Sequence, residues 1–261
     1  MTPVKALRLQ HPQGAELTVG GIPADRRFYL VDERGDLFDA TDHGPLLAVV
    51  PSYDPVTEHL RLTMPDGGVV EGRADRTDRE LATDFFGRTV VGDLVQGPFA
   101  EALSAFAGRP VRMARVRRDG DGQDVHPVTV VSSASVRDLG VKGEVGPDLD
   151  ARRFRITLEV DGCEPYEEDS WEEADVRVGA ATLRIRGQIP RCVVTTLAPD
   201  SGQKDFAALT TIARHRPRIG GRGGLPFGMY AGVVEPGPVR LGDAVEPLSS
   251  RPAGTASAAG R

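Results

Sequence analysis

Residues 150–202 read DARRFRITLEVDGCEPYEEDSWEEADVRVGAATLRIRGQIPRCVVTTLAPDSG, and this stretch carries the strongest structural signals of the chain. Short apolar runs alternate with turns that contain Gly, Pro and Asp, a pattern typical of short β-strands. The whole chain of 261 residues contains 31 Gly and 20 Pro, which disfavours long helices. We therefore predict a mostly β fold with a few short helices.

The run ARRFRITLEV at 151–160 is predicted to be a strand with two arginines on one face. Side chains alternate along a strand, so Arg153 and Arg155 would point the same way and Arg152 the opposite way. Two adjacent guanidinium groups can bind a phosphate or a carboxylate through paired hydrogen bonds. The alternative is that they are surface arginines that pair with the acidic segment that follows.

Cys192 is the candidate reactive residue. It follows Pro190 and Arg191, and Pro190 restricts the backbone just before it. A neighbouring cation lowers the pKa of a thiol, and the thiolate is the form that binds metals or attacks sulfur. The alternative is a structural cysteine, because free cysteines are often buried. Cys163 is the only other cysteine, too few for a disulfide framework or a four-cysteine metal site.

The same pattern of apolar runs and turns organises the rest of the chain. We predict strands at 27–31 and 36–40 around a turn at 32–35, a paired 46–50 and 60–64, a strand from Val69 after a turn at 66–68, and one at 89–95. Helices are predicted at 98–107, from Ser133 or Ser135 to Gly140, and at 204–214, and a mobile loop at 219–225. We place an N-terminal β module at 1–112, a second β domain at 113–248 and a disordered tail at 249–261.

Composition excludes several classes of protein. The net charge is −6 and the pI is near 5.5, which does not suit a nucleic-acid-binding protein. No apolar run approaches the roughly 20 residues of a transmembrane helix. The N-terminus has no charged segment followed by an apolar one, as a secretory signal would have. We expect a cytoplasmic protein without membrane or nucleic-acid partners.

Several motifs together resemble the MOSC family, whose domains are named after the C-terminal part of molybdenum-cofactor sulfurase. They are RFR-x-x-x-x-V-x-G-C-x-x-Y-x-E-D-S-W at 153–171, PRC-x-x-T-T-x-x-P-D-S-G at 190–202 and FG-x-Y-x-x-V-x-x-P-G-x-V-x-x-G-D-x-V at 227–245. Segment 124–135 resembles the family's D-x-x-P-x-x-x-x-S-x-x-S. Residues 25–38 and 106–113 resemble its N-terminal β-barrel module. The resemblance extends to about Leu248.

The resemblance implies a MOSC-type β-barrel with an N-terminal β module. In the branch of the amidoxime-reducing components, it implies a molybdenum cofactor with Cys192 as the metal ligand. Arg27 and Arg155 would contact the phosphate of the pterin, and Asp124 matches an aspartate near the metal, a catalytic position. Thiolate suits such a metal, and arginines suit a phosphate with about two negative charges. Further candidates for cofactor binding are Arg153, Arg191 and Thr157.

Three departures from the family pattern concern groups that hold the cofactor. Relatives carry YP-hydrophobe-KS-x-x-G on the first strand, whereas residues 9–15 read LQHPQGA and lack the Lys-Ser pair. Thr157 stands in place of an Asn, and ATDHGP at 40–45 lacks an Arg. Each charged hydrogen bond contributes about 1.5–3 kcal/mol, so such losses weaken phosphate binding. Arg26 or Arg152 could compensate.

Three functions are consistent with this sequence. The first is a molybdenum-cofactor oxidoreductase that reduces N-hydroxylated or related N–O small molecules. Its electrons would come from an external donor protein, because the chain has no cysteine cluster for an iron–sulfur centre. The alternative is a metal-free sulfur-handling enzyme in which Cys192 carries a persulfide or attacks a C–S or S–S bond. The third is a non-enzymatic binding module. Pyridoxal phosphate is a further candidate ligand.

Overall fold

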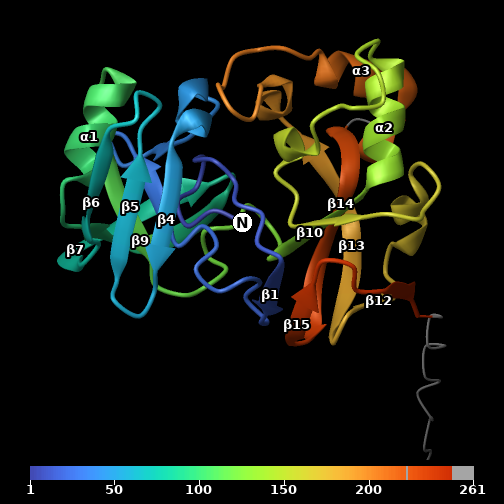
Figure 1. The fold of residues 1–261 in the computed structure, drawn as a ribbon, viewed down its shortest axis with the longest axis horizontal. Coiled ribbons are helices and arrows are strands. Elements are labelled where there is room, and N and C mark those ends of the chain that lie inside the picture. The colour runs from blue at the N-terminus through green and yellow to red at the C-terminus, as the bar shows by residue number, and fades with distance from the viewer. Residues whose placement is uncertain (222, 249–261) are drawn as a thin grey trace, which may run out of the picture.

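Two β-rich units lie side by side in the computed structural model, which describes residues 1–221 and 223–248 (Figure 1). Most strands are short, and the described residues contain three α-helices. The mostly β fold with a few short helices is therefore confirmed. None of these helices is long and apolar enough to cross a bilayer.

The N-terminal unit contains two antiparallel sheets, one with the order β3-β2-β9-β8-β7 and one with the order β4-β5-β6. The helix α1 (Phe99–Ala107) covers this unit, and Phe28, Leu62 and Phe99 are buried in its core. Its strands are β2 (Phe28–Val31), β3 (Leu37–Phe38), β4 (Val50–Asp54), β5 (His59–Thr63), β6 (Val69–Arg73), β7 (Arg76–Phe85), β8 (Arg88–Val95) and β9 (Arg112–Val116).

Local sequence explains why one prediction for this unit is correct and another is wrong. The predicted turn at 32–35 joins β2 and β3, because the Asp32 carboxylate accepts three backbone N–H groups. The predicted strand at 46–50 is wrong, since Gly44–Ala48 is a 3₁₀ helix, η1, with Pro45 at its start. The helical turn buries two successive leucines, which a strand with alternating side chains would separate.

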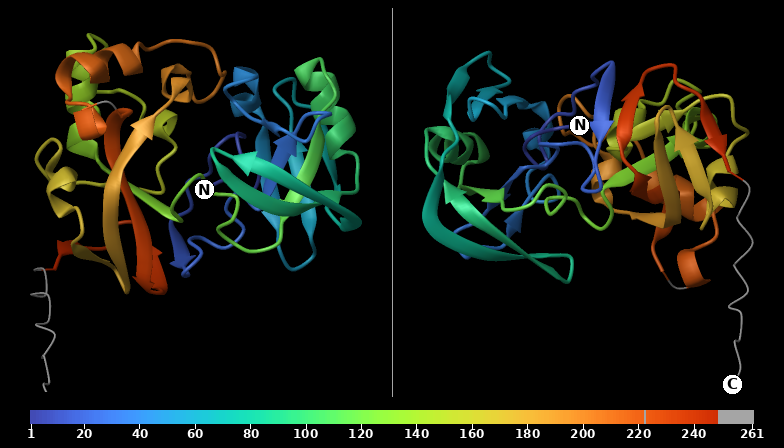
Figure 2. Two further views of the ribbon diagram at one scale, coloured as in Figure 1. Left: turned by 180° about the vertical axis from the view of Figure 1, so that it is seen from behind. Right: turned by 90° about the horizontal axis from the view of Figure 1, so that it is seen from below.

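The C-terminal unit is a six-stranded sheet of order β11-β10-β14-β13-β12-β16 that curves into a nearly closed barrel (Figure 2). Leu183, Ile185 and Met229 are fully buried in its core. Its strands are β10 (Val128–Ser132), β11 (Leu158–Val160), β12 (Asp175–Val178), β13 (Ala181–Arg191), β14 (Leu225–Glu235) and β16 (Val245–Pro247). The helices α2 (Ser133–Lys142) and α3 (Ala208–His215) pack at one end of this sheet (Figure 1).

The helices of this unit differ in how well the sequence located them. The start of α2 is as predicted, because the Ser132 side chain accepts the Ala134 N–H and caps the helix. The helix α3 begins later than predicted, because Lys204 pairs with Leu197 in a β-bridge. The predicted mobile loop includes residue 222, which lies outside the described residues. The predicted tail at 249–261 lies outside them entirely.

The N-terminal segment joins the two units. Strand β1 (Gly14–Leu17) pairs with β15 (Gly237–Arg240), so it belongs to the C-terminal unit although it precedes every strand of the other. Val4 is buried in the core of the N-terminal unit, whereas Leu17 is buried in the core of the C-terminal unit. The division into 1–112 and 113–248 remains a prediction, and residues 4–17 contact both units.

A second contact between the units needs two glycines. Gly202, in the loop before α3, has a left-handed φ of 70°, and a Cβ atom there would overlap the carbonyl oxygen of Gly44. A Cβ atom on Gly44 would in turn overlap the carbonyl oxygen of Gly202. This close approach holds the loop after Cys192 against the first residue of η1.

Gly202→Ala is expected to lower the free energy of unfolding by roughly 2–5 kcal/mol. About 1–2 kcal/mol comes from the left-handed backbone and about 1–3 kcal/mol from the steric overlap. The control is Gly67→Ala. Gly67 also has a positive φ, of 87°, but no atom lies within 4 Å of the position of an added Cβ atom. Chemical denaturation of both variants measures the difference, and equal losses would show that the loops separate without cost.

Candidate functional site

A cavity between the two units encloses about 980 Å³ of empty space, part of it open to solvent. Small-molecule and cofactor sites have this size and often lie where two domains meet. Its walls come from both units, so neither unit forms the site alone. The lining residues used below are Lys5, Arg26, Asp39, Phe86, Asp124, Val125, His126, Thr129, Arg153, Arg155, Arg191, Cys192 and Tyr230.

Cys192 lines this cavity at the end of β13. The carbonyl oxygen of Cys192 accepts a hydrogen bond from the Thr195 hydroxyl at 2.9 Å, inside the 3₁₀ helix η4 (Val193–Thr196). The pairing of β13 with β14 is irregular between Ile185 and Pro190, and such irregularities are common next to active sites. The residue is exposed, so its thiol is accessible to a ligand.

The pKa of the Cys192 thiol is raised, which contradicts the predicted lowering. Desolvation by the cavity walls is the largest cause, and the charges of Asp39 and Asp124 add to it. The Val194 N–H and the Arg191 charge act in the opposite direction and are outweighed. The free thiol is therefore protonated at neutral pH. A metal ion would displace that proton, because metals bind the thiolate.

Arg191 is directed at backbone carbonyls, which explains its small effect on the thiol. Its Nε donates to the Phe227 carbonyl oxygen at 2.6 Å and its Nη1 to the Phe154 carbonyl oxygen at 2.9 Å. Its Nη2 is buried and has no hydrogen-bond partner in the part of the chain that the structure describes. Desolvation lowers the pKa of Arg191 to about 10, so it remains charged at neutral pH.

The run 151–160 is not one strand. Ala151–Phe154 forms a 3₁₀ helix, η2, and β11 begins only after it. Asp150 caps this helix, because its carboxylate accepts the Arg152 N–H at 3.0 Å. Arg155 ends the helix with a left-handed φ of 54°. The sequence contained the capping signal, an Asp immediately before the first residue of the helix.

Arg153 and Arg155 consequently do not share a strand face, and that prediction is wrong. Both still line the cavity. Arg153 is buried and pairs with the Asp205 carboxylate at 2.9 and 3.1 Å. Arg155 donates to the Leu7 carbonyl oxygen at 2.9 Å instead. Arg153 therefore belongs to a structural ion pair, whereas Arg155 is a cation that faces the cavity.

Arg155 lacks an acidic partner. Across residues 1–221 and 223–248, no carboxylate lies within ion-pair distance of Arg155 or of Arg191. Desolvation, followed by the nearby charge of Arg26, lowers the pKa of Arg155 to about 10. The guanidinium is thus protonated at neutral pH and partly buried. Such a charge is stable only with a counter-charge or many hydrogen bonds, which an anionic ligand would supply.

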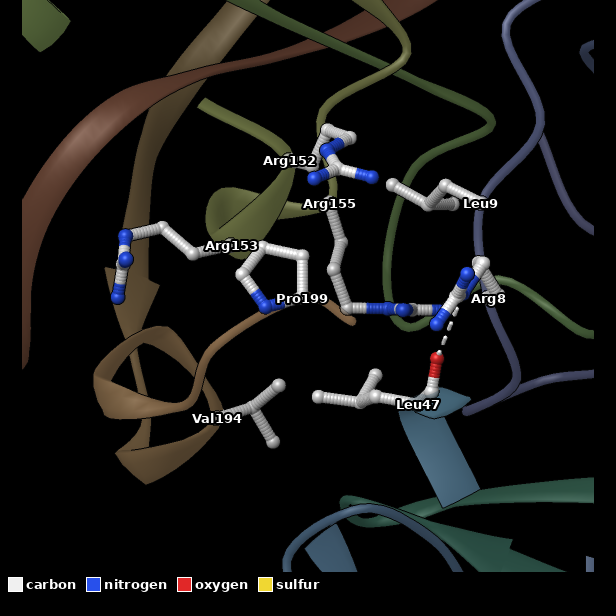
Figure 3. Close-up of a pocket in the computed structure, with 8 residues that line it drawn as sticks. All are labelled: Arg8, Leu9, Leu47, Arg152, Arg153, Arg155, Val194 and Pro199. Atoms are coloured by element: carbon white, nitrogen blue, oxygen red, sulfur yellow. Dashed lines mark hydrogen bonds between the residues drawn. The ribbon is translucent and has the colours of Figure 1, made fainter. Parts of the chain in front are cut away.

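A smaller hollow of about 270 Å³ adjoins the cavity and shares Arg153 and Arg155 with it (Figure 3). Arg152 binds the Asp200 carboxylate at 2.6 and 2.9 Å, and Arg8 binds the Asp200 carbonyl oxygen at 2.7 Å. In Figure 3 the Arg155 side chain extends toward Arg8. Arg8, Arg152 and Arg153 each pair with an aspartate, so among the arginines that line this hollow Arg155 is the one without an ion-pair partner in the described residues.

Lys5 also lines the cavity, so a lysine reaches the site from the N-terminal segment although residues 9–15 lack the Lys-Ser pair. Its ammonium group pairs with the Asp124 carboxylate and donates to the Gly122 carbonyl oxygen at 3.2 Å. Residues 2–6 read TPVKA, which fits YP-hydrophobe-KS at Pro, hydrophobe and Lys. The pattern therefore begins at residue 2 rather than 9. Ala6 stands where the pattern has Ser.

Asp124 is held as a carboxylate. Desolvation raises its pKa, but the charge and hydrogen bond of Lys5 outweigh this and leave the pKa of Asp124 below its ordinary value. The predicted catalytic residue thus lies on the cavity wall in its ionised form. It can accept a hydrogen bond from a ligand, and it is not a proton donor at neutral pH.

Two predicted cofactor-binding residues do not line the cavity. Arg27 pairs with Asp119 in the segment between β9 and β10, and its neighbour Arg26 lines the cavity instead. Arg26 has a left-handed φ of 51°, which turns the two successive arginines of DRRF in different directions. Thr157 lies behind the wall, where its backbone N–H donates to the Thr129 hydroxyl at 2.9 Å.

Two aromatic groups complete the site: Tyr230, which the sequence did not single out, and His126, which it offered as a possible acid or base near the pocket or as a packing residue. Tyr230 stacks at a tilt on His126, with ring centroids 5.3 Å apart, and both line the cavity. Burial lowers the pKa of His126, so this imidazole is neutral at pH 7. No group of three or more His, Cys, Asp or Glu residues suited to a metal ion occurs within the described ranges. A metal would have to bring most of its own ligands.

Comparison with known proteins supports one family. The MOSC domain model matches residues 117–246. Mitochondrial amidoxime-reducing component 1 of Mus musculus is 36% identical over 93% of this chain and 79% of that protein. Mitochondrial amidoxime reducing component 2 of Bos taurus is 31% identical over 93% and 80%.

A more distant relative is the molybdenum cofactor sulfurase of Oryza sativa subsp. japonica, which is 27% identical over 89% of this chain and 32% of that protein. The matches to the amidoxime-reducing components extend through both β units and include the residues around Cys192. On these grounds the chain belongs to the MOSC domain family.

Proposed function

We propose that this protein binds the molybdenum cofactor with Cys192 as the protein ligand of the metal, and that it reduces N-hydroxylated or related N–O compounds. The observation that carries the proposal is an exposed cysteine that lines the same cavity as two guanidinium groups without acidic partners in the described chain. Relatives over nearly the whole chain are named as amidoxime-reducing components.

The donors of the cavity fit such a cofactor. A soft sulfur suits the metal, and cationic side chains suit the phosphate of the pterin. The unpartnered Nη2 of Arg191 and the unneutralised charge of Arg155 are groups that a bound anion would satisfy. Lys5 and Arg26 add charge at the N-terminal wall, although each already pairs with an aspartate.

The side chains of this protein would bind and orient, whereas the bound cofactor supplies two-electron redox chemistry. Arg155 and Arg26 would hold the anionic end. Asp124, fixed by Lys5, would accept an N–H of the substrate. Reduction of an N–O bond consumes two electrons and two protons and releases water, and the electrons would come from a separate donor protein.

The metal-free sulfur-handling alternative has less support. A persulfide carrier or a sulfur nucleophile needs a thiolate, and the raised pKa of Cys192 disfavours that form in the free protein. Lys5 also supplies a cation to the cavity, which supports binding of an anionic cofactor over a metal-free site.

Metal analysis tests the proposal directly. Protein purified from cells that make the cofactor is expected to contain stoichiometric molybdenum and pterin, and Cys192→Ser is expected to lose most of the molybdenum. Cys163→Ser is the matched control, because Cys163 lies outside the cavity and should retain both. Wild-type protein without molybdenum, or equal metal content in both cysteine variants, would refute the proposal.

Arg155→Met is expected to weaken retention of the pterin roughly 10- to 150-fold, because a charged hydrogen bond contributes about 1.5–3 kcal/mol and each 1.4 kcal/mol is tenfold. Arg27→Met is the control, since Arg27 pairs with Asp119 away from the cavity. Pterin fluorescence after extended dialysis measures both. A larger loss in the Arg27 variant would reverse this assignment.

The pH dependence of alkylation tests the raised pKa of Cys192. In protein made without the cofactor, modification of Cys192 by iodoacetamide should be slow at pH 7 and rise about tenfold per pH unit to beyond pH 9. Asp39→Asn should shift this rise to lower pH, because the Asp39 charge disfavours the thiolate. Peptide mass spectrometry measures the rates, and a plateau already at pH 7 would contradict the account.

A further inference from the structure

Two exposed apolar side chains, Phe86 and Val125, line the cavity that contains Cys192. Phe86 is 65% exposed and Val125 is 58% exposed. Single exposed apolar residues are ordinary on a protein surface, but these two border one cavity. Phe86 comes from the turn between β7 and β8, and Val125 comes from the segment that links the two units. Neither takes part in the proposed binding of the cofactor.

The turn presents the Phe86 ring to solvent. Phe86 has a left-handed φ of 55° and Gly87 has a φ of 89°, and the Asp84 carboxylate accepts the Gly87 N–H at 3.0 Å. A bulky residue is disfavoured in this conformation, where Gly or Asn is common. Phe85 is fully buried against Tyr29 and anchors the strand. The Phe86 ring therefore contributes little to the core, and a strained, exposed aromatic at a cavity points to a binding role.

The β7–β8 turn is tied to the segment that carries Asp124 and Val125. Nη2 of Arg88 donates to the carbonyl oxygens of Asp121 at 2.9 Å and of Gln123 at 2.6 Å. The ammonium group of Lys5, which pairs with Asp124, lies 5.9 Å from the centre of the Phe86 ring. The apolar pair thus lies next to the charged pair, at the open side of the cavity.

We propose that Phe86 and Val125 form an apolar subsite for an aromatic or branched alkyl group of the substrate, beside the polar part of the cavity that takes its N–O group. This rests on the proposed function, and it names the substrate class as compounds with an uncharged apolar substituent on the reducible group. Asp124 would receive the substrate N–H while the substituent packs on the Phe86 ring. An aromatic ring buried in this way contributes roughly tenfold or more to affinity.

The test compares Phe86→Asn with the wild-type protein. Asn is favoured in the left-handed turn, so this variant removes the ring without adding backbone strain. The control is Val56→Asn, an 89% exposed residue outside the cavity. Binding of benzamidoxime and of acetamidoxime to purified full-length protein is measured by calorimetry, and their reduction is measured with a chemical electron donor.

Phe86→Asn is expected to weaken benzamidoxime binding roughly tenfold, with a matching loss of kcat/KM, and to change acetamidoxime binding less than twofold. Val56→Asn should change neither. Equal losses for both compounds, no loss for either, or no binding of benzamidoxime to the wild-type protein would overturn the subsite. Selective binding in protein that reduces neither compound would support the subsite and reject the proposed function.

Discussion

The unneutralised charge of Arg155 is the constraint on which the site depends. Arg155 ends the helix η2 with its backbone in the left-handed region. Its guanidinium group donates to a single backbone carbonyl oxygen, that of Leu7. A partly buried cation without a counter-charge is costly, by several kcal/mol in many proteins. Lys5, Arg26 and Arg153 each pair with an aspartate, so Arg155 retains its charge for a ligand. An anion in the cavity would stabilise the fold as well as the complex.

The cavity exists because both β units meet around the N-terminal segment. Asp25 is buried and joins three parts of this arrangement: it accepts the Thr2 N–H at 2.6 Å and the Gln123 side chain at 2.7 Å, and it pairs with Arg26. These bonds fix the segment that carries Lys5 against the segment that carries Asp124. The contact of Gly44 with Gly202 closes another part of the junction. The site is therefore a property of the whole chain.

Sequence patterns predicted most of the polar residues that line the cavity, but they predicted the local backbone around those residues less well. The PRC motif identified Cys192, and the β-rich architecture followed from Gly, Pro and short apolar runs. The arginine pair of 151–160 was placed on a strand, because the capping effect of Asp150 is local and competes with the apolar pattern. Lys5 was missed because the family pattern was aligned with residues 9–15. The pKa of the Cys192 thiol depends on burial and on the charge of Asp39, which is distant in sequence. The neighbouring Arg191 alone therefore predicts a lowered pKa, whereas the pKa is raised.

The measurement that tests the central claim most directly is X-ray absorption at the molybdenum edge on the purified protein and on Cys192→Ser. If the Cys192 thiolate binds the metal, the spectrum of the wild-type protein will show one more sulfur atom bound to molybdenum than the spectrum of the metal that remains in the variant. Identical sulfur coordination in the two proteins would contradict the account, because the metal would then be held without this cysteine.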